Sequence, residues 1–142
     1  PDQSVRLELI GDGPDQAALA LLADQLGLPG RVDFLGWRPR AETLARMRSA
    51  RAVLVPSISE GFGLSLAEAM SLGCPVLASD IAVFREVASE GGGVRVLPSS
   101  DPASWANAMA GAQTPAFLPT GVLDQAVMAQ RYLALYRSGD RT

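Results

Sequence analysis

Short apolar runs alternate along this chain with amphipathic stretches, and turns rich in glycine and proline separate them. An apolar run of about four to eight residues is typical of a buried strand, and apolar residues spaced three or four apart are typical of a helix. The pattern predicts strands at 5–10, 32–35, 52–56, 75–78 and 94–97. The run at 52–56 lacks alternation, which favours a central parallel strand.

A helix is predicted after each strand. The predicted helices cover 14–27, 41–50, 63–72 and 82–89, a segment after Asp101, and 122–137, which follows an irregular stretch at 113–120. Pro14 is expected at the first helical position, and Asp101 is expected to cap the helix that begins at Pro102. The first helix carries Leu19, Leu22 and Leu26 on one face.

Alternating strands and helices predict an α/β fold, with a Rossmann-like parallel sheet, right-handed crossovers and helices on both faces. In such sheets ligands bind at the carboxyl ends of the strands. The loops after the strands are therefore the segments in which to look for a site.

The composition suits one globular domain, with 142 residues, 48% of them hydrophobic and 19% charged. The net charge is −3 and all 12 basic residues are arginine, so we expect no general binding to nucleic acid. The chain has no histidine, which excludes a Ser-His-Asp triad, histidine-ligated zinc and imidazole acid–base chemistry.

Cys74 is the only cysteine, so no internal disulfide can form. We interpret it as a small buried residue, with a reactive thiol as the alternative. No apolar run reaches the roughly 18 residues of a membrane span, and residues 1–4 are no signal peptide. The first strand follows so directly that we expect the chain to start inside a longer protein.

The first candidate site is the segment 11–16, between a predicted strand and a helix. Gly11 and Gly13 superficially match a dinucleotide-binding turn, but Gln16 replaces the third glycine and no acid ends the second strand. A tight turn explains the glycines without a ligand, and it is the favoured interpretation.

The second candidate is the loop 57–62 with the helix that follows it. Gly61 and Gly63 permit close approach of the backbone to a ligand, and free amides at the helix start can hold a diphosphate. Glu60 in the loop can reach hydroxyl groups, and Glu68 in the helix can accept hydrogen bonds from a ribose diol. The alternatives are a solvated Glu60 and a capping box formed by Ser65 and Glu68.

The frame from Glu60 to Met70, Glu-Gly-Phe-Gly-Leu followed by Glu-Ala-Met, resembles the paired-glutamate signature of family 4 retaining glycosyltransferases of the GT-B fold. The resemblance covers nearly the whole chain. Further matches, in order, are 9–14, 32–36, 73–80, 84–87 and 101–102. The segment 80–87 also resembles bacterial mannosyl- or rhamnosyl-type transferases.

The resemblance implies a role for each matched position. Glu60 would bind donor-sugar hydroxyls at the reaction centre, and Glu68 would bind the ribose. Backbone groups of Gly61, Phe62, Gly63 and Leu64 would contact the sugar and the diphosphate. The loop Gly36, Trp37 and Arg38 would meet the nucleobase, although a surface or core aromatic and a solvated arginine are the alternatives for Trp37 and Arg38.

Two parts of the family pattern are missing. The family places an Arg and a Lys just upstream of the first strand, where they bind the diphosphate, and this chain has no lysine. The acceptor-binding domain is missing too. Residues 1–142 are therefore expected to form a single donor-binding domain, truncated at its N-terminal side and inactive alone.

The implied reaction transfers a hexosyl group, with retention, from a UDP- or GDP-linked sugar in glycan or polysaccharide biosynthesis. No metal and no cofactor is expected, because no Asp-x-Asp motif is present. A sugar, glycan or lipid-linked acceptor would bind through the missing domain. We expect a cytoplasmic protein, and any attachment to the inner face of the membrane would belong to the missing half. A non-catalytic nucleotide-sugar-binding or assembly module and an unrelated flavodoxin-like domain remain as alternatives.

Overall fold

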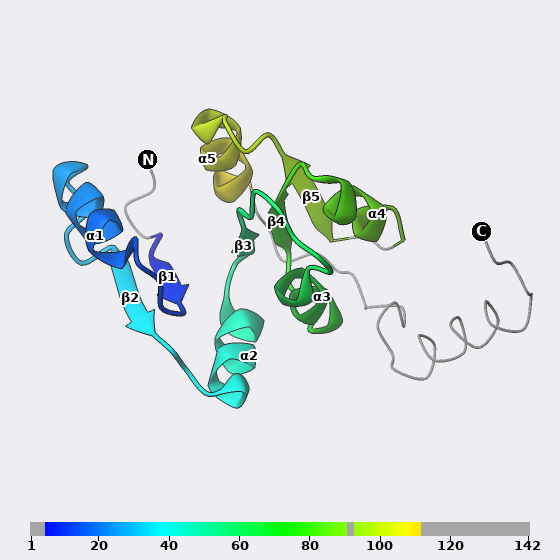
Figure 1. Ribbon diagram of the computed structural model, residues 1–142, viewed down its shortest axis with the longest axis horizontal. Coiled ribbons are helices and arrows are strands. Elements are labelled where there is room, and N and C mark those ends of the chain that lie inside the picture. The colour runs from blue at the N-terminus through cyan, green and yellow to red at the C-terminus, as the bar shows by residue number, and fades with distance from the viewer. Residues whose placement is uncertain (1–4, 91–92, 112–142) are drawn as a thin grey trace, which may run out of the picture. The chain divides into compact units, whose positions relative to one another are not determined.

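The computed structural model describes residues 5–90 and 93–111. The chain divides into two compact units, residues 1–46 and 47–142, and each has its own sheet (Figure 1). Helix α2 (Arg40–Ser49) crosses the boundary between the units. The predictions for 113–120 and 122–137 lie outside the described residues, and the prediction of a single domain stays a prediction.

The first unit contains β1 (Leu7–Ile10), α1 (Gln16–Gln25) and β2 (Val32–Gly36). The strands pair in parallel, with Leu7 opposite Val32 and a register shift after Leu9. At their carboxyl ends, the amide of Gly11 donates to the carbonyl of Gly36 at 2.9 Å. The two loops that follow the strands therefore begin side by side.

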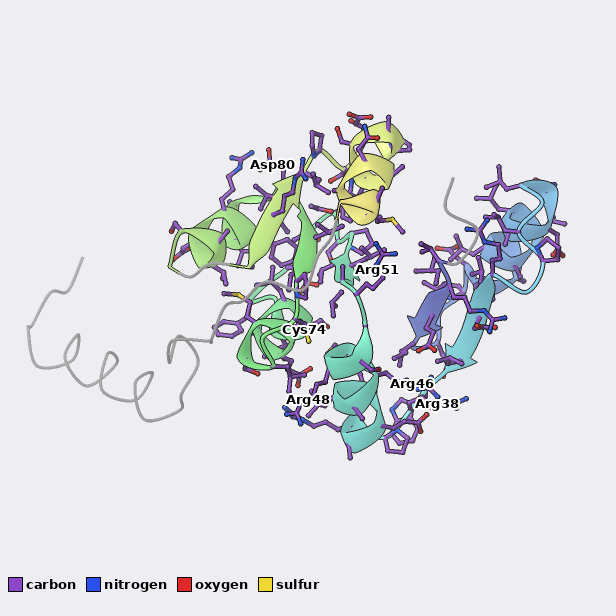
Figure 2. All side chains as sticks on the ribbon, turned by 180° about the vertical axis from the view of Figure 1, so that it is seen from behind. Arg38, Arg46, Arg48, Arg51, Cys74 and Asp80 are labelled. Carbon is purple, nitrogen blue, oxygen red and sulfur yellow. The ribbon has the colours of Figure 1, made fainter. Side chains whose placement is uncertain are left out.

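Arg46 links α2 to β1 within this unit (Figure 2). Its guanidinium is 2.9 Å from Glu42 Oε1 and 3.0 Å from Glu8 Oε2. The hydrogen bonds to Glu42 and then Glu8 raise the pKa of Arg46 above its ordinary value. Since all three side chains are partly exposed, we assign this network to orientation of the helix more than to stability.

The second unit holds a parallel sheet in the order β3 (Val53–Val55), β4 (Val76–Ser79), β5 (Val94–Leu97). Its helices are α3 (Leu64–Ser71), α4 (Ala82–Glu90) and α5 (Pro102–Ala110). Every residue of β4 is buried, as expected for a central strand with helices on both sides.

The alternation of side chains along β4 separates two cores. Val76 and Ala78 pack with residues of α3 and with Phe84 of α4. Leu77 points to the other face, where it packs with Leu97 of β5 and Ala108 of α5. The predicted placement of helices on both faces is confirmed for this sheet.

The predicted parallel α/β class is confirmed, and the five strands fall into two sheets where the sequence suggested one. The predicted start of one helix was wrong. Helix α1 begins at Gln16 with Asp15 as its N-cap, so Pro14 is not its first residue. The amide of Gln16 donates to the carbonyl of Gly13, and this bond places Pro14 inside a turn. Proline suits that turn position because its φ is already fixed.

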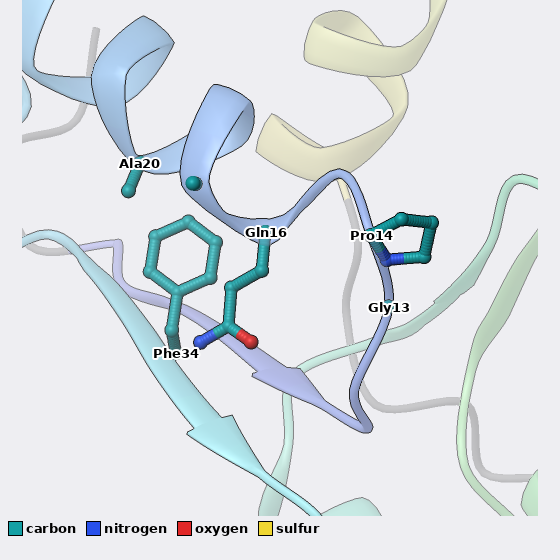
Figure 3. A pocket seen from close by; sticks show the side chains of 6 residues that line it. Gly13, Pro14, Gln16, Ala20 and Phe34 are labelled. Atoms are coloured by element: carbon teal, nitrogen blue, oxygen red, sulfur yellow. The ribbon is translucent and has the colours of Figure 1, made fainter.

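The leucine face of α1 does not cover β2. Leu19, Leu22 and Leu26 are 46%, 47% and 63% exposed. The small side chains of Ala17 and Ala20 line a hollow together with Phe34 of β2, and Figure 3 shows Ala20 beside the Phe34 ring. None of the described helices is long and apolar enough to cross a membrane.

Candidate functional site

The loop between β3 and α3 starts from a fixed point and ends in a conformation that requires glycine. Val55, the last residue of β3, is 5% exposed and belongs to the core. Eight residues later Gly63 is the N-cap of α3, with φ 75° and ψ 48°. This left-handed conformation is disfavoured for residues with a Cβ and natural for glycine.

The start of α3 leaves its amides unpaired. The first hydrogen bond onto the helix runs from the amide of Ala67 to the carbonyl of Gly63, at 3.0 Å, and no side chain caps the helix. Within the described residues, the amides of 61–66 donate to no acceptor. Unpaired amides at a helix start carry partial positive charge, so they form a surface suited to an anion.

The capping-box alternative is wrong. Ser65 is the second residue of α3, two positions too late to serve as the N-cap, because Gly63 takes that position. Glu68 is the fifth residue of α3 and is half-buried. No side chain caps α3, so the helix start stays open.

Glu60 lies in the exposed part of the loop, where the hydroxyl of Ser57 donates to its Oε1 at 2.9 Å. The predicted solvated carboxylate is thus exposed but has a partner. Ser57 was not among the site residues predicted from the sequence. A hydroxyl three residues before an acid, in a loop after a strand, was the available signal.

The two glycines of the loop differ. A Cβ on Gly63 would stand 2.7 Å from Cε1 of Phe84, whereas a Cβ on Gly61 would meet nothing within 4 Å. Gly63 is therefore required by the fold itself. Phe62 and Leu64, on either side of Gly63, are 45% and 67% exposed. Side chains so exposed contribute little to the core and are available to a ligand or another surface.

In the first unit, Asp12 organises the loop after β2. Its Oδ2 accepts a hydrogen bond from the amide of Trp37 at 3.1 Å, and its Oδ1 lies 3.1 Å from where a Cβ on Gly36 would be. Gly36 has φ 63°, so both conformation and space favour glycine. The Trp37 side chain is 69% exposed, which decides against a core aromatic.

Arg38 is held at the surface by its neighbours. Its Nε lies 3.4 Å from Glu42 Oε1, and its Nη1 donates to the carbonyl of Trp37 at 3.1 Å. This arrangement fits the solvated-arginine alternative, while contact with a nucleobase stays a prediction. Figure 2 shows Arg38 near the start of α2.

The segment 11–16 borders an open hollow of about 440 Å³ (Figure 3). Its lining is mostly apolar and comprises Gly13, Pro14, Gln16, Ala17, Ala20 and Phe34. Gln16 is its one polar side chain, and no cation lines it, so it lacks the groups that hold a diphosphate. The positive φ of Gly11, 120°, accounts for that glycine by backbone geometry.

Cys74 is buried, and its thiol donates to the carbonyl of Met47 at 3.0 Å (Figure 2). Burial raises the pKa of the Cys74 thiol, and the charge of Arg48 acts in the opposite direction. The predicted small buried residue is confirmed. No group of three or more potential metal ligands occurs among residues 5–90 and 93–111.

A parallel α/β fold with an open helix start after its third strand defines the class of a Rossmann-like ligand-binding domain. The family of glycosyl transferases group 1 matches residues 1–112, and the chain belongs to that family. The family resemblance predicted from the sequence is confirmed.

Curated relatives of the chain have names that agree with this family. The D-inositol 3-phosphate glycosyltransferase of Corynebacterium glutamicum (strain R) is 34% identical over 114 residues, which are 78% of this chain and 27% of that protein. The phosphatidyl-myo-inositol mannosyltransferase of Mycobacterium leprae (strain TN) is 34% identical over 131 residues, 92% of this chain and 32% of that protein. The chain thus spans about a third or less of the length of these relatives.

Solved structures show the same fold. Sucrose-phosphate synthase from Thermosynechococcus elongatus matches with a TM-score of 0.74 and 25% identity, over 94% of this chain and 38% of that one. Anabaena HepE in complex with UDP matches with a TM-score of 0.73 and 27% identity, over 97% of this chain and 42% of that one. The Rossmann-like, GT-B-type architecture predicted from the sequence is confirmed.

Proposed function

We propose that this chain is the donor-binding part of a retaining glycosyltransferase that transfers a hexosyl group from a UDP- or GDP-linked sugar. Membership of the glycosyl transferases group 1 family and the relatives named as a glycosyltransferase and a mannosyltransferase support glycosyl transfer. The solved HepE structure contains UDP, which supports a nucleotide ligand for this fold. We place the reaction in glycan or polysaccharide biosynthesis in a bacterial cytoplasm.

The observation that carries the proposal is the open start of α3, where the amides of 61–66 have no acceptor in the described part of the chain. A sugar nucleotide loses its diphosphate as the glycosidic bond breaks, so negative charge grows on the leaving group. Amides already directed at that charge stabilise it without reorganisation, which is the main source of catalysis in such a step. No metal ion is required in this scheme.

Two carboxylates flank these amides in the sequence and complete the proposed donor site. Glu60, three residues before the Gly63 N-cap, would accept hydrogen bonds from hydroxyls of the donor sugar. Glu68, one turn into α3, would accept from the ribose diol. Gly61, Phe62, Gly63 and Leu64 would offer their backbone groups to the sugar and the diphosphate.

For the loop Gly36, Trp37 and Arg38 we retain the proposed contact with the nucleobase. The exposed Trp37 ring and the Asp12 bond that holds the Trp37 amide support it, because a fixed loop with an exposed aromatic suits a planar ligand. A sugar, glycan or lipid-linked acceptor would bind elsewhere in the full-length protein. The names of two relatives make inositol-containing acceptors the first compounds to test.

The test combines binding and turnover in the full-length protein. Calorimetry with UDP, GDP and their sugars identifies the donor, and transfer is then compared for the unaltered protein, Glu60→Ala and Glu68→Ala. We expect Glu68→Ala to weaken nucleotide binding and Glu60→Ala to abolish transfer while the bare nucleotide still binds. NMR of the product should show the anomeric configuration of the donor.

Glu86→Ala is the matched control, because Glu86 is an exposed glutamate on α4 outside the loop. It should leave binding and transfer unchanged. If an active enzyme keeps full activity in both Glu60→Ala and Glu68→Ala, the catalytic role of this loop is refuted. If the unaltered protein binds nucleotide sugars but transfers nothing, the chain belongs to a non-catalytic binding module.

A further inference from the structure

Ser57 connects the loop to the buried sheet. It follows Val55, the buried last residue of β3, by two residues, and Pro56 between them has a fixed φ. Ser57 itself is half-buried. Its hydroxyl therefore starts from a well-defined position at the carboxyl end of the strand.

Glu60 lacks such support of its own. Its side chain is exposed. The next residue is Gly61, and a Cβ added to Gly61 would meet no atom within 4 Å. A glutamate with three rotatable bonds in this setting samples many orientations, and fixing it costs conformational entropy. The hydrogen bond from Ser57 Oγ to Glu60 Oε1, at 2.9 Å, restricts that freedom.

We propose that Ser57 is a positioning residue, which holds the Glu60 carboxylate in the orientation that receives the donor sugar. The inference rests on the proposed function of Glu60. Ser57 occupies one acceptor position of Oε1, and the carboxylate keeps its remaining lone pairs, including both on Oε2, for sugar hydroxyls. Ser57 does not touch the reacting atoms in this scheme; it acts through Glu60.

Loss of a hydrogen bond that positions a carboxylate should lower a rate constant about fivefold to tenfold, because about 1.4 kcal/mol corresponds to a factor of ten. We therefore expect Ser57→Ala to lower kcat/KM of the full-length enzyme about fivefold to tenfold. Ser57→Thr keeps the hydroxyl and should restore most of the activity. Ser59→Ala is the control, because Ser59 is an exposed serine of the same loop without a described hydrogen bond.

Binding gives a readout that a general loss of loop structure would not reproduce. Glu60 is assigned to the sugar and not to the nucleotide, so Ser57→Ala should weaken binding of the sugar nucleotide while the affinity for UDP or GDP alone stays the same. In a Glu60→Ala background the same substitution should have no further effect on either ligand, because the side chain that Ser57 orients has been removed.

The outcomes separate the two proposals. If Glu60→Ala is as active as the unaltered enzyme, the proposed role of Glu60 fails, and the role of Ser57 fails with it. If Glu60→Ala is impaired but Ser57→Ala is not, only the inference about Ser57 is overturned. It is overturned as well if Ser57→Ala weakens binding of bare nucleotide and sugar nucleotide equally, or weakens binding equally strongly in the Glu60→Ala background.

Discussion

The ring of Phe84 occupies the space that a side chain at position 63 would need: a Cβ on Gly63 would lie 2.7 Å from Cε1 and 3.3 Å from Cδ1 of the ring. Phe84 is fully buried, so the ring has no room to move away. Because Gly63 is also the left-handed N-cap of α3, the contact fixes where the unpaired amides of the helix begin. Packing between α4 and α3 thus determines the geometry of the proposed phosphate site.

Gly63→Ala should therefore damage both fold and function. The left-handed backbone costs a residue with a Cβ about 1–2 kcal/mol, and overpacking against a buried ring costs about 1–3 kcal/mol. We expect a loss of about 2–5 kcal/mol in the free energy of unfolding, measured by urea denaturation, together with loss of nucleotide binding. An unchanged unfolding midpoint would contradict the Phe84 contact.

Gly61→Ala separates ligand contact from folding. A Cβ at this position meets open space and the backbone is not in the left-handed region, so stability should change by less than about 1 kcal/mol. If the Gly61 backbone approaches the sugar or the diphosphate as proposed, the added methyl group should weaken sugar-nucleotide binding about tenfold or more. Calorimetry beside the urea curve checks both; unchanged affinity would remove Gly61 from the site.

The sequence was informative where one residue determines its own surroundings. The Asp101 cap is confirmed because a carboxylate before a proline at a helix start has few other roles. The residues from Glu60 to Met70 carry the family resemblance because Glu60, the glycines and Glu68 lie close together in one continuous segment, a loop and the helix that follows it. The parallel pairing of β3, β4 and β5 likewise agrees with the parallel sheet predicted from the short apolar runs.

Features that depend on two distant segments were missed. The contact of Phe84 with Gly63 joins residues of different helices, so nothing in either local pattern announces it. The bond from the Trp37 amide to Asp12 spans 25 positions in the same way. Pro14 was misplaced because proline suits both the first turn of a helix and the turn before it, and local propensity does not distinguish them.

The cap of α5 should make stability depend on acid pH. Hydrogen bonds from the Ser104 side chain, then from the amides of Ser104 and Ala103, hold the pKa of Asp101 below its ordinary 3.8. A carboxyl whose pKa is lower in the folded state stabilises it above the unfolded value, and this contribution is lost as pH falls through the folded value. Thermal unfolding should therefore show Asp101→Ala less stable than the unaltered protein near neutral pH, with a difference that shrinks below pH 3.8 as the pH falls through the lower pKa of the folded state.

Asp101→Asn is the control for that experiment, because asparagine caps helices as well as aspartate does and does not titrate. The thermal stability of Asp101→Asn should stay close to that of the unaltered protein near neutral pH. The ion pair of Asp80 with Arg85, which lowers the pKa of Asp80, is present in all three proteins and cancels in the comparison. A gap between the unaltered protein and Asp101→Ala that persists in acid would argue against the cap as its cause.

Cys74 should be unreactive in the folded protein. Its burial keeps the thiol protonated by raising the pKa, and the thiolate is the form that reacts with disulfide reagents. We expect less than about one tenth of the labelling rate of a free thiol at neutral pH, and full labelling in denaturant. Timed labelling followed by mass spectrometry measures both, and fast labelling under native conditions would revive the reactive-thiol alternative.

Glycosyl transfer by the full-length enzyme should survive removal of divalent metal ions. In the proposed scheme the leaving diphosphate is stabilised by the amides at the start of α3, which are permanent features of the backbone. Excess EDTA should therefore leave the initial rate within about a factor of two, whereas an enzyme that used a metal ion as a Lewis acid would lose several kcal/mol of transition-state stabilisation. Gly63→Ala, which displaces those amides, should depress the rate to the same extent with and without EDTA. If EDTA stops transfer and Mg²⁺ or Mn²⁺ restores it, the negative charge of the diphosphate is met by a metal ion, and the helix start has only a binding role.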